Sequence, residues 1–270
     1  MQIIANNITT RNPRLASILR ESISVSNDTE NVACPGLKDV AESCLAAGAD
    51  ILEINLQQHN DRPQVMDFAV NVIQRYTNCQ LCLSSNSIAT LEVGLKACRR
   101  APIVNYINIE TAQLREIFPL VIRYNAEVIF LVSDPAAPAD ATQMLEKAAV
   151  LVEAANGSGI TNDRIILDPG LIHINKDPGQ RHLEEVFEFL QALPETFDSP
   201  VKTTCWIGNS SAGVPARLRP VIEIPLLAML FGQGLTSVFL DILRPENKRA
   251  LHLLKIFRNE EVYADEVLSL

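Results

Sequence analysis

Eight short apolar runs, separated by longer amphipathic stretches, constrain the fold of this chain more than any other feature of its sequence. Each run has the length of a β-strand and each interval has helical periodicity, so the pattern predicts βα units and a parallel sheet. The predicted strands are Gln2–Ala5, Asp50–Leu56, Gln80–Ser84, Ile103–Tyr106, Glu127–Val132, Arg164–Leu167, Lys202–Ile207 and Ser237–Leu240. Eight units in 270 residues fit a single (β/α)8 TIM barrel.

The predicted helices lie at about 36–48, 63–77, 87–98, 110–124, 139–156, 180–193, 224–234 and 246–257. Residues typical of helix ends support this count, because Pro35-Gly36 suits a helix start and Asp140 suits an N-cap. Residues 6–35 are the exception, since this stretch is too long for an ordinary loop. We interpret it as an extended first βα connection that contains a short helix, Pro13–Arg20, within one domain covering residues 1–270.

Composition narrows the class of protein. The net charge of -9 and the lack of a Lys/Arg cluster disfavour nucleic acid and anionic membranes as partners. No apolar run reaches the length of a membrane span, and the N-terminus does not resemble a signal peptide. Six scattered cysteines are not typical of a disulfide framework, so we expect a cytoplasmic protein.

Polar residues follow most of the predicted strands. Asp168 is the clearest case, because Pro169-Gly170 ends its strand abruptly, although an Asp at this position can also be simply a turn former. In a barrel, the carboxyl ends of the strands form the mouth where chemistry takes place. The candidates there are Asn6, Glu53, Asn55, Ser84, Asn105, Asp168, Gly208 and Asn209. A rim rich in amides suits a neutral, planar ligand with many hydrogen-bonding groups, unless these are merely loop residues.

Other chemistries find little support. The chain has no G-x-S-x-G, P-loop or H-E-x-x-H motif, and its four histidines lack metal-ligand spacing, so we predict no metal site. His173 follows the sixth predicted strand, and we interpret it as a loop histidine in solvent. Lys202 begins the seventh predicted strand, at the end of the barrel opposite the mouth, and we expect a structural role for it.

Several motifs together carry a resemblance to a known family. They are Leu81-Cys-Leu-Ser-Ser, Leu91-Glu-Val-Gly-Leu-Lys-Ala-Cys98, Leu167-Asp-Pro169, Gly208-Asn-Ser210 and Leu227-Ala-Met229. From Met1 to about Asp241 the chain resembles the pterin-binding barrels. It looks most like the methyltetrahydrofolate:corrinoid/iron–sulfur protein methyltransferases, and more distantly like dihydropteroate synthase and the folate domain of cobalamin-dependent methionine synthase.

The resemblance implies roles for individual residues. Asp168 matches the carboxylate that binds the aminopyrimidine edge of the pterin, and Asn105 matches an amide of the same pocket. Asn209 corresponds to the catalytic asparagine near N5. The further substrate-binding residues implied are Asn6, Glu53, Asn55, Ser84, Gly208 and Arg219. The likeness also implies a tetrahydrofolate-type pterin as substrate, a corrinoid carried by a partner protein, and a homodimer.

Departures from the family pattern leave two functions open. Ser84 replaces a family Asp that is a second pterin ligand, and Glu53 replaces another Asp. Our leading hypothesis is methyl transfer between N5 of a methyl-tetrahydropterin and the cobalt of a corrinoid protein. The alternative is a pterin-barrel homologue that binds an altered ligand or partner without methyl transfer. Dihydropteroate synthase activity is disfavoured, because the seventh strand has no Ser-x-Lys ending and no Arg-x-His follows.

Overall fold

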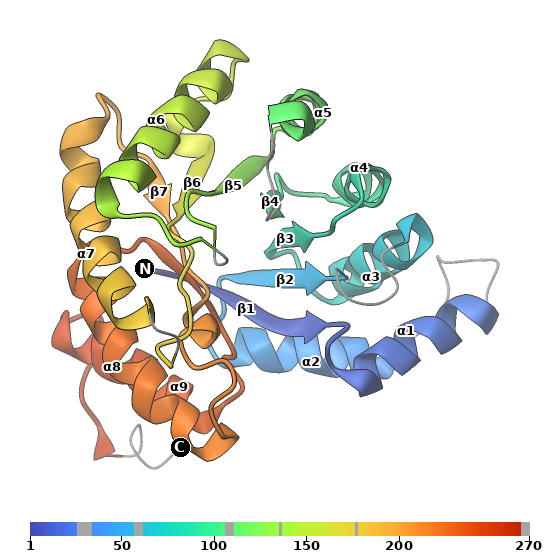
Figure 1. The fold of residues 1–270 in the computed structure, drawn as a ribbon. Helices are drawn as coiled ribbons and strands as arrows, with labels where there is room; N and C mark the ends of the chain where they lie inside the picture. The colour runs from blue at the N-terminus through green and yellow to red at the C-terminus, as the bar shows by residue number, and fades with distance from the viewer. Residues whose placement is uncertain (26–33, 57–61, 106–110, 135–136, 176–177, 266–270) are drawn as a thin grey trace.

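In the computed structural model, eight parallel strands form one barrel with helices around it (Figure 1). The structure describes residues 1–25, 34–56, 62–105, 111–134, 137–175 and 178–265. The strands are β1 (Gln2–Thr9), β2 (Ile51–Asn55), β3 (Gln80–Ser84), β4 (Ile103–Asn105), β5 (Glu127–Leu131), β6 (Ile165–Asp168), β7 (Lys202–Thr203) and β8 (Ser237–Leu240). Their order, β7-β6-β5-β4-β3-β2-β1-β8, follows the chain except that β8 lies beside β1. The predicted single (β/α)8 TIM barrel is confirmed.

The barrel closes between β7 and β8 through a short contact. Trp206 and Phe239 form a parallel bridge, and the Phe239 N–H donates to the Cys205 carbonyl at 2.8 Å. The predicted seventh strand, Lys202–Ile207, was too long, because the β6–β7 ladder ends at Thr203. Its partner strand stops at Asp168, where the Pro-Gly pair turns the chain away.

The first strand was predicted too short. β1 continues past Ala5 because its register shifts between Ala5 and Ile8, so that Asn6 and Asn7 lie opposite the single residue Glu53 of β2. Asn6 therefore lies at a β-bulge inside the strand and not at its end. The extended connection begins after Thr9, and its helix α1 (Pro13–Val25) is longer than predicted.

The remaining helices match the predicted positions closely. Asp140 forms a capping box with Gln143 at the start of α6, as its position predicts. α8 begins earlier than residue 224, because Pro220 is tolerated in the first turn of a helix. The helices are α2 (Pro35–Ala46), α3 (Pro63–Tyr76), α4 (Ile88–Ala97), α5 (Thr111–Arg123), α6 (Ala141–Gly157), α7 (Gly179–Thr196), α8 (Arg219–Gly232) and α9 (Pro245–Phe257).

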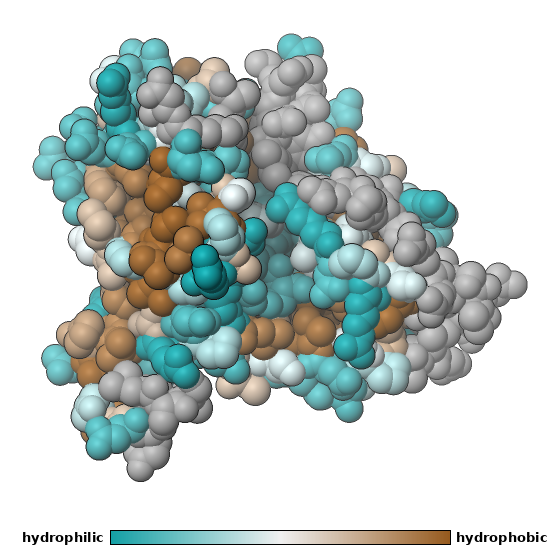
Figure 2. Space-filling model, turned by 60° about the horizontal axis from the view of Figure 1, so that its bottom comes forward, coloured by the Kyte–Doolittle hydropathy of each residue, from teal (hydrophilic) through white to brown (hydrophobic). Residues whose placement is uncertain are grey.

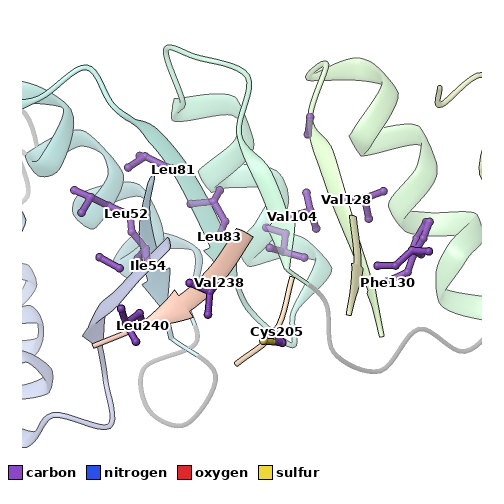
Figure 3. Packing of buried hydrophobic residues seen from close by; sticks show 14 of the residues in the cluster. Leu52, Ile54, Leu81, Leu83, Val104, Val128, Phe130, Cys205, Val238 and Leu240 are labelled. Carbon is purple, nitrogen blue, oxygen red and sulfur yellow. The ribbon is translucent and has the colours of Figure 1, made fainter. Parts of the chain in front are cut away.

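Hydrophobic residues form two separate clusters because side chains alternate across each strand. The larger cluster lies between the outer face of the sheet and the helices, and Figure 3 shows part of it, including Leu52, Leu83 and Val128. The smaller cluster contains residues from several strands and holds Ile4, Ile51, Cys82, Ile103, Ile129, Ile166 and Phe239. These residues alternate with those of the larger cluster, so they fill the barrel interior.

Part of the helical surface is hydrophobic. Helices α6–α9 lie on the left in Figure 1. They remain on the left in Figure 2, where a prominent brown area marks hydrophobic residues. No helix among the described residues is long and apolar enough to cross a membrane.

Candidate active site

The interior of the barrel changes from apolar to polar toward the carboxyl ends of the strands. Two residues beyond most of the apolar interior positions, on the same face of the strand, a polar side chain follows; Ile129, which Leu131 follows, is an exception. Ile51 is followed by Glu53 and Asn55, Cys82 by Ser84, Ile103 by Asn105, and Ile166 by Asp168. All five polar residues are buried. The structure thus places these predicted site residues at the mouth of the barrel, above the apolar residues that fill the barrel interior.

Four of them form one hydrogen-bonded network across β2, β3 and β4. The Ser84 hydroxyl donates to Glu53 Oε1, and Asn55 Nδ2 donates to the same oxygen at 3.0 Å. Asn105 Nδ2 in turn donates to Ser84 Oγ at 3.0 Å. The strand register supports this arrangement, because Asn55 pairs with Ser84 and Ser84 pairs with Asn105.

Glu53 is the acidic member of this network. Burial raises the pKa of its carboxyl from 4.5 to about 7, although hydrogen bonds from the network and the charge of Arg11 act in the opposite direction. Its Oε1 accepts two hydrogen bonds, whereas its buried Oε2 has no partner within the described parts of the chain. Glu53 can therefore exchange a proton near neutral pH, and a proton would be held on Oε2.

Asp168 ends β6 and is both a turn former and a buried carboxyl. Its Oδ1 accepts the N–H of Gly170 at 2.8 Å, and Gly170 has a φ of +74°. Burial raises the pKa of Asp168 from 3.8 to about 7, with the Gly170 N–H acting in the opposite direction. A ligand that brings N–H donors to this carboxylate would offset the cost of burying it.

The other predicted residues line a cavity of about 370 Å³ at the ends of β1, β7 and β8. Asn209 is the last residue of a 3-10 turn, Ile207–Asn209, that follows β7. The residues around this cavity are Asn6, Thr9, Arg11, Trp206, Ile207, Gly208, Asn209, Ala212, Gly213, Arg219, Glu223, Asp241 and Arg244. The predicted site is therefore divided into a buried network, the Asp168 turn and this cavity.

Of the three arginines that line the cavity, Arg244 is paired with carboxylates, whereas Arg11 and Arg219 make other contacts. Arg244 donates to Glu223 at 2.6 Å and lies 3.9 Å from Asp241, so it is neutralised by two carboxylates. Arg11 lies over the Trp206 ring at 5.9 Å, and Arg219 donates to the Val214 carbonyl at 3.0 Å. Within the described ranges neither guanidinium forms a salt bridge, although the charge of Arg11 acts on the Glu53 carboxyl. The cavity suits the anionic part of a ligand.

His173 lies beside the cavity and not in open solvent, as its loop position had predicted. It is half-buried, and its Nδ1 lies 2.6 Å from the Asn209 carbonyl oxygen. Because a carbonyl can only accept, Nδ1 carries the proton and the imidazole anchors the Asn209 turn. Lys202 has the expected position far from the mouth, where its Nζ binds Glu127 at 2.6 Å.

Comparison with known proteins defines the family. The sequence from residue 24 to residue 218 matches the family described as pterin binding enzyme. The chain belongs to this family.

Solved structures with the same fold include several dihydropteroate synthases. The enzyme from Yersinia pestis, with a pterine-sulfa conjugate, has a TM-score of 0.67 at 15% identity, over 96% of this chain and 94% of that one. The enzyme from Thermus thermophilus, in complex with 6HMPPP, gives 0.62 at 14% identity over 94% and 93%. The Coxiella burnetii enzyme, in complex with pteroic acid, gives 0.60 at 16% identity over 94% of each chain. At these identities the likeness shows a shared fold.

Sequence reasoning missed several residues of this pterin-binding enzyme's cavity. Arg11, Trp206, Asp241 and Arg244 line it although no motif marks them. Each follows closely after β1, β7 or β8, so their positions after strands were the available signal. Arg11 and Trp206 were overlooked because the ends of β1 and β7 were misplaced. The end of β8 was predicted correctly, and Asp241 and Arg244 were overlooked although they follow it.

Proposed function

We propose that this pterin-binding enzyme transfers a methyl group between N5 of a methyl-tetrahydropterin, such as methyltetrahydrofolate, and the cobalt of a corrinoid carried by a partner protein. The observation that carries this proposal is the position of Asn209 in an open cavity beside the buried acidic mouth. None of the described residues that line that cavity is Cys, His, Lys or Ser. The described lining therefore offers no thiol, imidazole or amine to accept the methyl group, which favours direct transfer between two bound reactants.

The roles of the residues follow from the chemistry of N5. A tertiary amine leaves poorly unless it is protonated, so transfer requires a group that favours the charged form of N5. The Asn209 amide oxygen can accept a hydrogen bond from protonated N5 without taking the proton, which stabilises the transition state. A Co(I) corrinoid supplies the electron pair that receives the methyl group, and N5 keeps the electrons of the broken bond. Asp168 and Asn105 would hold the aminopyrimidine edge.

The cavity arginines extend this assignment to the rest of the substrate. Arg11 and Arg219 form no salt bridge within the parts of the chain described, so they can bind the carboxylates of a folate tail. Asn6 and Gly208 lie around the same cavity. A folate-type substrate would thus place its ring at the acidic mouth and its tail toward β1 and β8.

A second candidate function is ligand binding without turnover. Ser84 favours it, because its hydroxyl is already bonded to Glu53 and lacks the charge of a carboxylate. An altered ligand would then be held by a weaker set of acceptors.

One assay separates the two functions. The purified protein is mixed with methyltetrahydrofolate and free Co(I) cobalamin, while the cobalt spectrum reports methylation. We expect transfer, and we expect Asn209→Ala to slow single-turnover transfer about 100-fold with a change of less than about threefold in binding, because the amide acts mainly in the transition state. Lys202→Gln, at the far end of the barrel, is the matched control. Tight pterin binding without any transfer would favour the second function, and absence of both would refute pterin chemistry.

We also propose that two copies associate through α8. Its outer face carries Val221 and Met229, with exposed fractions of 70% and 53%, and Leu218, just before the helix, is 44% exposed. The charged residues Arg219 and Glu223 of α8 turn toward the cavity. A face without charge can pack on its own copy around a two-fold axis without pairing like charges. Sedimentation velocity should show a dimer that Val221→Lys dissociates. Val150→Lys on α6, where the valine is 66% exposed, is the control. A monomeric wild type would refute this proposal.

A further inference from the structure

The direction of the hydrogen bonds in the buried network has a consequence for ligand selection. A serine hydroxyl has one proton to donate, and Ser84 gives it to Glu53 Oε1. Toward Asn105 the Ser84 oxygen can therefore only accept, and it accepts from Nδ2 at 3.0 Å. The amide nitrogen of Asn105 is thus held toward β3, which leaves its carbonyl oxygen, Oδ1, on the other side of the amide.

Protonation of Glu53 does not reverse this direction. Oε1 already accepts from Ser84 and from Asn55 Nδ2, so it has no room for a proton of its own. Oε2 is buried and has no partner among the residues described, so it is the oxygen that takes a proton. In the neutral acid Oε1 remains a carbonyl-type acceptor. The order Asn105 to Ser84 to Glu53 therefore holds for both forms of the carboxyl.

The backbone keeps this chain of donors in place. Glu53, Ser84 and Asn105 belong to the adjacent strands β2, β3 and β4, and their exposed fractions are 0%, 0% and 3%. No hydrogen bond reaches Asn105 Oδ1 from any residue in the described ranges. This oxygen is the end of the hydrogen-bonded chain, so a ligand that displaces water from it must supply a donor in its place.

We propose that Glu53 is a positioning residue that acts through Ser84 to present Asn105 Oδ1 to the ligand, so that the site selects a ring edge with an amino donor and rejects a carbonyl edge. The inference deepens the proposed pterin function, on which its choice of ligand rests. It assigns to Glu53 a role in specificity that does not require contact with the ligand.

The test compares two probes that differ at this edge. Pterin carries an amino group at C2 of its bicyclic ring, whereas lumazine carries an oxo group there. Fluorescence titration at a pH where both are neutral gives their dissociation constants. We expect the wild type to prefer pterin by about 10- to 100-fold, because a carbonyl facing Oδ1 leaves a buried acceptor unpaired.

Variants of the network should remove this preference. In Glu53→Gln the new amide can turn either its oxygen or its NH2 group toward Ser84, so the direction is no longer imposed, and the preference should fall below about threefold. Ser84→Ala breaks the chain and should do the same, while Ser84→Thr keeps the hydroxyl and should keep the preference. Glu127→Gln changes a carboxylate at the other end of the barrel and serves as the control, with wild-type preference expected.

The outcomes separate this inference from the proposed function. If the wild type binds lumazine as tightly as pterin, or binds neither, the inference is overturned. It is also overturned if folded Ser84→Ala or Glu53→Gln keeps the full preference. Methyl transfer to cobalamin with no preference between the probes would refute the inference alone. A preference that depends on Glu53 in a protein that transfers no methyl group would refute only the methyltransferase.

Discussion

Replacing Asp168 with Asn should stabilise the protein at alkaline pH while removing pterin binding. The Asp168 carboxyl is buried, and the one hydrogen bond that it accepts from the described residues comes from the Gly170 N–H. An amide at this position can accept the same bond through its oxygen but carries no charge to bury. The variant thus removes the cost of ionising a buried group and keeps the turn. It also removes the carboxylate that the aminopyrimidine edge would bind.

The pKa shift determines the size and sign of this effect. The Asp168 pKa is about 7 in the folded protein against an ordinary value of 3.8, so between these values the native state binds more protons than the unfolded state. The free energy of unfolding of the wild type therefore falls as pH rises through this window, by up to about 1.4 kcal/mol per pH unit. Above pH 8 both states are ionised, and the full difference amounts to roughly 4 kcal/mol.

Urea denaturation of both proteins between pH 4 and pH 8.5 measures this difference. Glu53 titrates in both, so its contribution largely cancels in the comparison. We expect the advantage of Asp168→Asn to be small at pH 4, to grow through pH 7 and to level off above it. An advantage that is independent of pH, or a variant that is less stable at pH 8.5, would show that Asp168 is stabilised in its charged form by contacts that burial does not reveal.

Other predictions concern the same mouth. Gly170→Ala should destabilise the protein by about 2 kcal/mol or more in urea, because φ is +74° and a Cβ would lie 2.6 Å from the Ser133 carbonyl oxygen; an unchanged midpoint would contradict the strain. Ser84→Asp should weaken methyltetrahydrofolate binding in calorimetry, because the new carboxylate at position 84 faces the Glu53 carboxylate. The double variant Ser84→Asp/Glu53→Gln should bind methyltetrahydrofolate about as well as the wild type or better. Equal losses of affinity in the single and the double variant would refute the repulsion. Arg219→Gln should raise the dissociation constant of methyltetrahydrofolate about 10-fold and leave that of pterin, which has no tail, unchanged; parallel changes for both ligands would place Arg219 at the ring.

The positions of the strands show what local sequence can predict. The run Ile165–Leu167 is apolar on both faces and is followed closely by Pro169-Gly170, so the sequence predicted this strand and its end to within one residue. The end of β1 could not be predicted in this way, because the continuation of β1 past Ala5 depends on a bulge against β2. β7 was misjudged for a similar reason, since its ladder ends where its partner β6 ends. Strand ends that depend on a neighbouring strand have no local signal.

The residues of the candidate site also divide into features that local sequence predicts and contacts that only the fold creates. Asp168, Asn105 and Asn209 were predicted as site residues from their places at strand ends and from the family motifs, but the sequence does not indicate which of them lie in contact. Glu53 and Ser84 look like two separate departures from a family pattern, and the fold makes them one hydrogen-bonded pair. Arg11 joins the cavity only because β1 ends at Thr9.

The sequence by itself determined the βα repeat, the barrel and the residue types at its mouth, because side-chain periodicity and turn residues act over a few neighbouring positions. Only the tertiary structure decided the burial that raises the pKa values of Glu53 and Asp168, the direction of the Ser84 hydrogen bond and the pairing of Arg244. These properties depend on desolvation and on distances between side chains from different strands, and neither quantity exists until the barrel has closed.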